Sequence, residues 1–297
     1  MGNGISPGEH VGDSVRRLAH DRLQPAVEAL KRSPGGDLDE VVYDVRKRCR
    51  KVRALLRLVR ADVGDELYKR ENDALRAAAR VLSPVRDAAV LVEVHDGVVA
   101  AGGISPGGFR DFLVERHEHL KGDLLAGDEL PLVCERLAAV LERTEVWPIT
   151  SSEWGGLGAG VERGYRRGRK AMAAAYADPG TERFHEWRKR VKYLRHQMEY
   201  LEGLWPEVIG AGVESAQALS RILGEAHDLA VLRDALADAG VDTEREAPLL
   251  ELIDSRRQLL RARARPIGQR VYAEKPSEFV ARLGCYWEAA ATPATVA

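Results

Sequence analysis

The sequence predicts an all-α protein built from helical bundles, and three observations carry this prediction. Ala, Leu, Arg and Glu dominate the chain, and all four favour helices. Segments with strand-like alternation of β-branched and aromatic residues are absent or short. Blocks of roughly 15–35 residues with helical character alternate with clusters of glycine and proline. We therefore expect helices packed on helices.

The clusters of helix breakers set the order of these blocks along the chain. The first cluster covers residues 33–36, the second 102–108 and the third 155–158. Two more lie at residues 178–180 and near Gly240. We expect helices in every interval between them. Residues 155–158 are interpreted as a linker, because a glycine-rich phosphate loop would need a strand before it.

Composition limits the class of protein further. The chain has 297 residues, of which 45 % are hydrophobic and 31 % charged, which is typical of a folded soluble protein. No apolar segment approaches the ~20 residues of a membrane helix, and the N-terminus lacks the pattern of a secretory signal. Cys49, Cys134 and Cys285 have no metal-binding or disulfide-framework spacing. We expect a cytoplasmic protein with no membrane partner, no cofactor and no bound metal.

Two sequence patterns occur twice, in the same order and at nearly the same spacing. Residues 43–53 match residues 185–195 at an offset of 142, with basic residues at five corresponding positions. Residues 82–91 match residues 223–232 at an offset of 141. Two matches at one spacing indicate an internal repeat. We predict an N-terminal helical half (residues 1–150) and a C-terminal half (151–297) that together form one domain.

The repeated basic segment places its charges along one side of a helix. In the first half the basic residues follow at i, i+4, i+7, i+11 and i+14, so they share a stripe roughly 21 Å long. These are Arg46, Arg50, Arg53, Arg57 and Arg60. The apolar residues one position earlier form a packing stripe, namely Val45, Cys49, Val52, Leu56 and Val59. In the second half, Arg188, Lys192 and Arg195 correspond to the basic stripe.

The formal net charge of −1 conceals a strong separation of charge along the chain. Four segments, 41–60, 163–170, 183–196 and 255–270, together carry +23 in 58 residues, and the rest of the chain carries −24. Like charges one helical turn apart cost about 0.2–0.5 kcal/mol per pair unless an anion offsets them. The repeated basic helices therefore indicate a polyanion-binding surface.

The motifs that carry these charges resemble those of the conserved histidine α-helical domain, or CHAD, family. Residues 185–195 (His-Glu-Trp-Arg-Lys-Arg-Val-Lys-Tyr-Leu-Arg) and 223–228 (Leu-Gly-Glu-Ala-His-Asp) resemble its second-repeat signatures. Residues 80–87 (Arg-Val-Leu-Ser-Pro-Val-Arg-Asp) resemble the first-repeat counterpart. The similarity covers about residues 10–290. It implies two helical bundles related by a pseudo-two-fold axis, with basic residues of both halves lining a central groove or cavity.

The resemblance also implies a ligand, inorganic polyphosphate, and an association with polyphosphate granules. The polyphosphate-binding residues expected by matching positions, together with the remaining members of the basic helices, are Arg46, Lys47, Arg50, Lys51, Arg53, Arg57, Arg169, Lys170, His185, Arg188, Lys189, Lys192, Arg195, Arg257, Arg261 and Arg265. Tyr43 stands where the first repeat of the family would carry histidine. Any dependence of binding on pH is therefore expected from the second half.

Some family members join this domain to a triphosphate tunnel metalloenzyme, which would need an N-terminal Glu-x-Glu-x-Lys motif. The chain lacks that motif, so we expect a stand-alone domain without enzymatic activity. Nucleic-acid or other polyanion binding stays open as an alternative, although few aromatic residues lie among the arginines.

A metal-dependent phosphohydrolase is the second alternative, because His185, His227 and Asp228 resemble its ligand order. The basic neighbours of His185 would repel a metal cation.

Asp87 and Asp228 are interpreted as acidic residues in the first turn of a helix, where a negative charge interacts favourably with the helix dipole.

Overall fold

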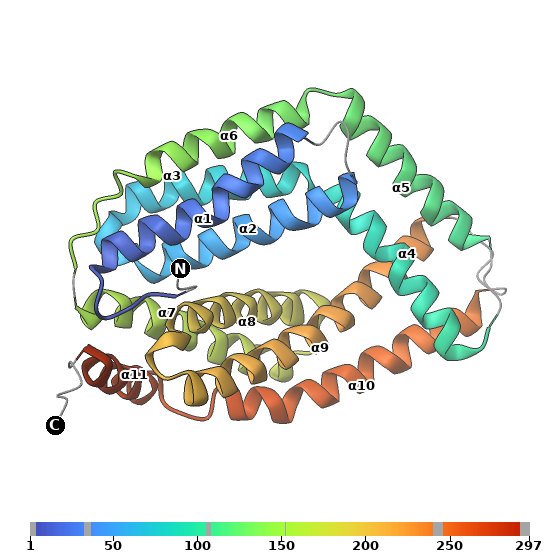
Figure 1. Cartoon of the computed structure of the whole chain (residues 1–297). Coiled ribbons are helices and arrows are strands. Elements are labelled where there is room, and N and C mark those ends of the chain that lie inside the picture. Colours follow the sequence, from blue (N-terminus) through green and yellow to red (C-terminus); the bar gives the residue numbers. More distant parts are fainter. Residues whose placement is uncertain (1–3, 33–36, 105–107, 152, 240–245, 292–297) are drawn as a thin grey trace.

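The computed structural model describes residues 4–32, 37–104, 108–151, 153–239 and 246–291. Over these residues the chain forms helices joined by short connections, with no strand, which confirms the all-α prediction (Figure 1). The breaker cluster predicted at residues 33–36 and the break near Gly240 lie outside the described residues.

Four helices of the N-terminal part pack into one bundle (Figure 1). They are α1 (Val11–Arg32), α2 (Leu38–Leu58), α3 (Arg60–Val81) and α6 (Glu129–Thr144). Asp37 caps α2, because its side chain accepts a hydrogen bond from the backbone N–H of Asp39 at 3.0 Å. The α1, α2, α3 and α6 helices enclose an apolar core that includes Leu23, Leu75 and Leu137.

Two helices extend from this bundle and reach the C-terminal part. They are α4 (Ser83–Gly102) and α5 (Phe109–Ala126), which pack against each other, while α4 also contacts two helices of the C-terminal part (Figure 1). Gly103 ends α4 in the left-handed conformation (φ 61°), which glycine adopts without the penalty that a Cβ atom would bring.

The C-terminal part forms a second group of packed helices (Figure 1). Its members are α7 (Trp154–Ala177), α8 (Thr181–Leu201), α9 (Pro206–Asp238), α10 (Ala247–Val271) and α11 (Pro276–Ala291). A short 3₁₀ helix, η2 (Glu202–Leu204), joins α8 to α9. Along the chain α7, α8, α9 and α10 each pack on the next, and α11 lies on α7.

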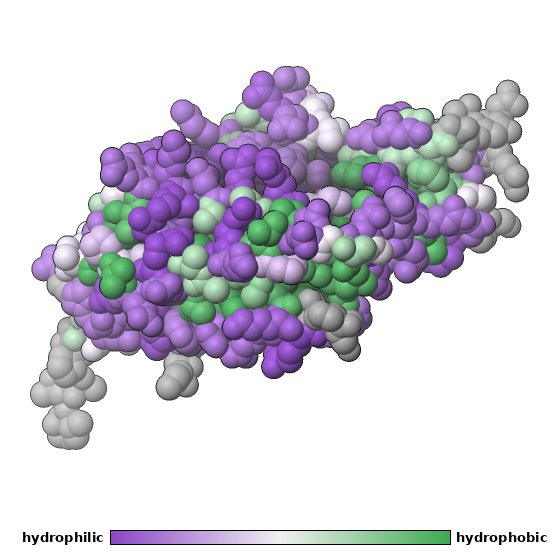
Figure 2. All heavy atoms as spheres, turned by 90° about the horizontal axis from the view of Figure 1, so that it is seen from above, coloured by the Kyte–Doolittle hydropathy of each residue, from purple (hydrophilic) through white to green (hydrophobic). Residues whose placement is uncertain are grey.

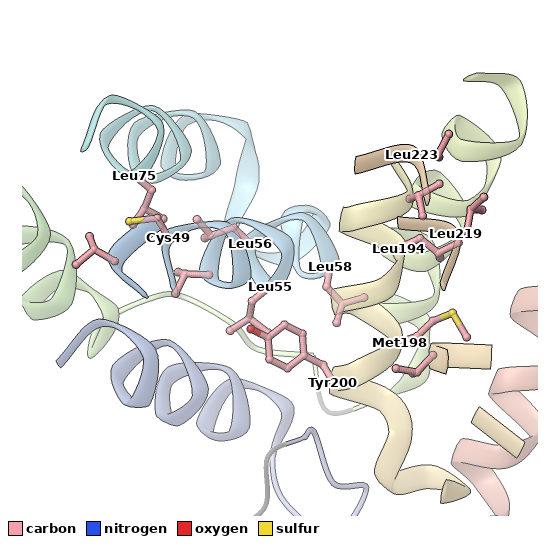
Figure 3. Close-up of a cluster of buried hydrophobic side chains, with 14 of the residues drawn as sticks. Cys49, Leu55, Leu56, Leu58, Leu75, Leu194, Met198, Tyr200, Leu219 and Leu223 are labelled. Carbon is pink, nitrogen blue, oxygen red and sulfur yellow. The ribbon is translucent and has the colours of Figure 1, made fainter. Parts of the chain in front are cut away.

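The two groups meet where α2 packs against α8 and α7. Figure 3 shows Leu55 and Leu58 on α2, with the ring of Tyr200 extending from α8 toward Leu55. All three side chains are buried, Tyr200 at 2 % exposure. This apolar contact fixes the relative position of the two helices that carry the predicted basic stripes.

The glycines at residues 155–158 are not a linker, so that expectation is wrong. They lie in the first turns of α7, which begins at Trp154. These positions are glycine because neighbouring helices pack closely against them. The interpretation of glycine as a helix breaker considers only the local sequence and misses such contacts. A Cβ atom at Gly156 would lie 2.8 Å from the Asp62 carboxylate of α3, one at Gly158 would lie 3.3 Å from Val280 of α11, and one at Gly160 only 2.0 Å from the carbonyl oxygen of Leu58 in α2. The glycines let α7 approach its neighbours closely.

Hydrophilic side chains cover most of the face seen in Figure 2, with separate hydrophobic patches among them. Within the described ranges, none of the helices combines the length and apolar character that crossing a membrane requires.

Candidate functional site

The apolar stripes of α2 and α8 bring their basic neighbours to the contact between the two helices. Val45, Cys49 and Val52 are completely buried, which confirms the packing stripe predicted in the first half, and Trp187 and Val191 are completely buried at the matching positions of α8. Each basic residue that follows one position later is then only partly buried. We use the name central basic cluster for four of these residues, which interact electrostatically with one another: Arg46, Arg50, Arg188 and Lys192.

Arg46 joins α2 to the start of α4. Its guanidinium donates to the backbone oxygen of Ala79 at 2.9 Å and to the hydroxyl of Ser83, and it pairs with Asp87 at 3.4 Å. The side chain of Arg46 is 17 % exposed, whereas that of Asp87 is 61 % exposed. The bonds to Ala79 and Ser83 hold the guanidinium in place, and the exposed Asp87 provides only weak neutralisation.

Arg188 takes the corresponding position in the C-terminal half. It pairs with Asp228 of α9 at 3.6 Å, and its Nε atom is buried without a hydrogen-bond partner in the described part of the chain. Gly224 of α9 lies beside this side chain, and a Cβ atom there would be 3.9 Å from Nε, an ordinary contact distance. The Arg46–Asp87 and Arg188–Asp228 pairs thus join matching positions of the two predicted repeats.

These pairs correct the role assigned to the two aspartates. Asp228 lies more than twenty residues into α9, far from the first turn that the helix dipole would favour. Asp87 lies near the start of α4, and its carboxylate pairs with Arg46. Asp87 and Asp228 occupy matching positions of the sequence repeat, as do Arg46 and Arg188. This shared position could have indicated the pairing with arginine.

Arg50 and Lys192 lie between the two pairs and lack a direct counterion. Over the described ranges, neither side chain forms a hydrogen bond or an ion pair. Burial, with the neighbouring Arg188 as the next cause, lowers the pKa of Arg50 to about 10 and the pKa of Lys192 to about 6. The centre of the cluster therefore repels itself when all members are charged, and a bound anion would relieve that repulsion.

Glu199 neutralises the next part of the predicted basic stripes. It pairs with Arg195 at 3.0 Å, with His196 at 2.9 Å and, across to α2, with Lys51 at 3.3 Å. These groups hold the pKa of Glu199 at about 2 despite its burial. Lys51 thus links α2 to α8 through Glu199, and both Lys51 and Arg195 have less charge available for a ligand than the central basic cluster.

Beyond the cluster, toward the first turns of α8 and α4, the two halves carry different side chains at matching positions. His185 and His227 lie with their Nδ1 atoms 3.3 Å apart, and burial lowers the pKa of both, that of His227 to about 3. In the N-terminal half the counterparts are Tyr43 and Arg86, whose guanidinium lies 5.2 Å from the Tyr43 ring centre. Histidines, which titrate near neutral pH, therefore occupy these positions in the C-terminal half alone. The expectation that any pH dependence of binding comes from the second half stays a prediction.

The remaining predicted residues of α2 and α8 lie around this centre. Lys47 lies 5.7 Å above the ring of Tyr43, and Lys189 pairs with Glu186 at 2.6 Å. Arg53 donates to the side-chain oxygen of Asn72 at 3.1 Å. The Arg57 guanidinium lies 4.0 Å above the ring centre of Tyr193 in α8, beyond the central basic cluster along α2.

The remaining predicted ligand residues lie on α7 and α10, outside the two helices that carry the central basic cluster. Arg169 and Lys170 are exposed on α7, where Arg169 donates to the backbone oxygen of Glu274. On α10, Arg257 pairs with Asp254 and donates to Thr181 at the start of α8. The other two lie on aromatic rings of neighbouring helices: Arg261 on Phe184 and Arg265 on Tyr176. Arg257 and Arg261 thus adjoin the first turns of α8 and Arg265 adjoins the last turn of α7, whereas Arg169 contacts Glu274.

The side chains that the phosphohydrolase alternative would need do not converge. Within the described ranges, no group of three or more His, Cys, Asp or Glu residues is arranged to hold a metal ion. His185 and His227 both lie near the cation Arg188, and His185 also interacts with Lys189 and with the carboxylates of Glu182 and Glu186. The residues present therefore suit an anion better than a divalent cation.

Comparison with known proteins defines the class to which this arrangement belongs. The family model for the CHAD domain matches residues 14–237, and the chain belongs to this family. Among solved structures, PptA from Streptomyces chartreusis is similar with a TM-score of 0.63 and 13 % identity, covering 90 % of this chain and 100 % of that one. The CHAD domain from the plant Ricinus communis has a TM-score of 0.55 and 17 % identity, covering 94 % and 93 %. Comparison with curated proteins gave no match.

Proposed function

We propose that this protein binds inorganic polyphosphate through the central basic cluster, and that it does so without catalysing a reaction. The observation that carries the proposal is the pair Arg50 and Lys192, which lie partly buried among further cations and form no direct ion pair or hydrogen bond in the described part of the chain, although Asp228 attracts Lys192. Uncompensated charge of one sign is costly in a partly buried place, so such a place is expected to have an anionic partner. The family membership agrees with this ligand.

The donors of the cluster suit phosphate oxygens. Arg46 and Arg188 present forked donors, held by Ser83 and Ala79 on one side and packed beside Gly224 on the other. Lys192 and Arg50 add charge between them. Such an arrangement can bind a flexible chain of phosphates without recognising a sequence of bases, and the protein would thereby associate with polyphosphate granules in the cytoplasm.

Nucleic acid is the weaker candidate, because the tyrosines near the basic residues already have cations on their rings. Lys47 and Arg86 lie over Tyr43, and Arg57 lies over Tyr193. A binder of single-stranded nucleic acid would use such rings to stack bases. The backbone phosphates are therefore the part of a nucleic acid for which the site is suited, and polyphosphate presents them at higher density.

Titration with polyphosphate and with single-stranded RNA at equal phosphate concentration tests this proposal. We expect tighter binding of polyphosphate, and we expect the charge reversal R50E/K192E to abolish it while the helical circular dichroism spectrum is retained. The substituted carboxylates would lie beside the cations Arg46 and Arg188, so we expect the folded state to keep its stability. The control R76E/R221E reverses two exposed arginines on α3 and α9. Stronger binding of RNA, or unchanged polyphosphate binding by R50E/K192E, would overturn the proposal.

A further inference from the structure

A second group of arginines surrounds a pocket between α2, α3, α7 and α8. The lining residues are Arg57, Arg60, Tyr68, Gly160, Arg163, Gly164, Arg167, Arg190, Tyr193 and Gln197. The set contains five arginines and no acidic residue. Arg60, Arg163, Arg167 and Arg190 are outside the residues that the sequence motifs assign to the ligand. The pocket therefore needs an explanation of its own.

The carboxylates that touch these arginines lie outside the pocket lining. Arg60 pairs with Asp65 at 2.8 Å, and Asp65 is 80 % exposed. Arg190 pairs with Glu186, and no ion pair is found for Arg163 or Arg167 in the described part of the chain. The pair with the exposed Asp65 contributes little, so Arg60 together with Arg163 and Arg167 would be available to an anion that contacts several arginines.

Both tyrosines of the pocket already have arginines against their rings, where a nucleobase would stack. The Arg57 guanidinium lies 4.0 Å from the ring centre of Tyr193 and 5.8 Å from that of Tyr68, and Arg60 lies 4.4 Å from that of Tyr68. These contacts fix two guanidinium planes at the pocket. The arrangement favours a ligand made of phosphate alone over a nucleotide.

The pocket is continuous with the basic stripe of α2 and is closed by α7. Arg53 lies over the same Tyr193 ring as Arg57, at 5.9 Å, so that ring connects the stripe with the pocket. On the inner side, a Cβ atom at Gly160 would lie 2.0 Å from the Leu58 carbonyl oxygen and one at Gly164 would lie 2.4 Å from the Gln197 side chain. A phosphate chain that follows the stripe therefore meets a closed floor at this point.

We propose that this arginine pocket binds the terminal phosphate of the polyphosphate chain; the inference rests on the proposed function. A terminal phosphate carries nearly two negative charges at pH 8 and exposes three oxygens, whereas an internal phosphate carries one charge and exposes two oxygens. The convergence of five guanidinium groups matches the more highly charged group, and the closed floor matches a chain that ends. The protein would thus select chains with free ends and bind them in one direction.

The test compares short polyphosphate chains of one length with free ends and with both ends blocked by ethanolamine through phosphoramidate bonds. It uses two neighbouring substitutions on α7: R167Q removes an arginine that lines the pocket, and R166Q removes one that does not line it and pairs with Glu162. Arg166 and Arg167 are both exposed, so neither change is expected to impair folding.

We expect the wild-type protein to bind free-ended chains about tenfold more tightly than blocked chains, as loss of a charged hydrogen bond would give. R166Q should keep this preference, and R167Q should lose most of it by weakening the binding of free-ended chains alone. Equal binding of both chains by the wild-type protein, or equal weakening of both by R167Q, would overturn the terminal-phosphate assignment and leave the proposed function standing. Failure of the wild-type protein to bind either chain would overturn both.

Discussion

Lys192 gives the binding reaction a measurable proton balance. In the free protein burial and neighbouring arginines lower its pKa from 10.5 to about 6, so at pH 8 only about 1 % of the side chain is charged. A bound polyphosphate favours the charged form and raises the pKa toward its ordinary value. Binding at pH 8 should therefore take up close to one proton for each occupied cluster, and the uptake should decrease as the pH falls toward 6.

Other groups contribute little at this pH. The pKa of Arg50 is about 10, so Arg50 is already charged, and the lowered pKa values of His185 and His227 keep both rings neutral in the free protein at pH 8. Isothermal titration calorimetry in two buffers of different ionisation enthalpy measures the number of protons taken up. The variant K192M should bind polyphosphate more weakly and take up almost no proton. Wild-type binding without proton uptake, or equal uptake by K192M, would refute the reasoning.

The same side chain sets the direction of a pH effect on stability. Because its pKa is lower in the folded than in the unfolded protein, folding releases a proton between about pH 6 and pH 10.5. The free energy of unfolding of the free protein should therefore rise as the pH increases through this window, and below about pH 6 the effect of Lys192 should be constant. K192M should remove this contribution, which urea unfolding at several pH values would detect.

Two further substitutions test the surroundings of the cluster and the packing that positions it. D228N removes the carboxylate that competes with phosphate for Arg188. Polyphosphate affinity should therefore rise about three- to tenfold at pH 7, while the free protein should lose about 1–2 kcal/mol of stability. A fall in affinity would contradict this role. G160A introduces a methyl group 2.0 Å from the Leu58 carbonyl oxygen and should lower the free energy of unfolding by about 2–3 kcal/mol. The control G155A, on the same helix, places a methyl group with no atom within 4 Å and should leave stability unchanged or slightly higher. Equal effects of the two substitutions would refute the packing argument.

The sequence predicted those features that depend on one helix at a time. The positions of Val45, Cys49 and Val52 at helical spacing indicated the buried side of α2, and the arginines one position later were correctly expected beside it. The repeat between residues 43–53 and 185–195 drew attention to α2 and α8, which are the helices that meet. Helical periodicity was sufficient in both cases because packing and charge follow the same helix axis.

Features that depend on contacts between helices could not be predicted in this way. The pairing of Asp228 with Arg188 requires α9 to lie beside α8, and local position on α9 suggested a different role. The glycines at residues 155–158 were interpreted as a linker, because the neighbours of Gly156 and Gly158, such as Asp62 of α3 and Val280 of α11, lie on other helices. The arginine pocket likewise combines residues of four helices, so no single stripe indicated it.

The central claim is that Arg50 and Lys192, which form no direct ion pair in the described part of the chain, bind polyphosphate in their charged forms. The most direct measurement is the dissociation constant of polyphosphate for the wild-type protein, R50E/K192E and the control R76E/R221E at one salt concentration and pH. Each charged hydrogen bond to phosphate is worth roughly tenfold or more in affinity, so R50E/K192E should bind at least about a hundredfold more weakly, while R76E/R221E should stay within about threefold of the wild type. Equal loss of affinity in both variants would show that binding depends only on overall charge, and it would contradict the account.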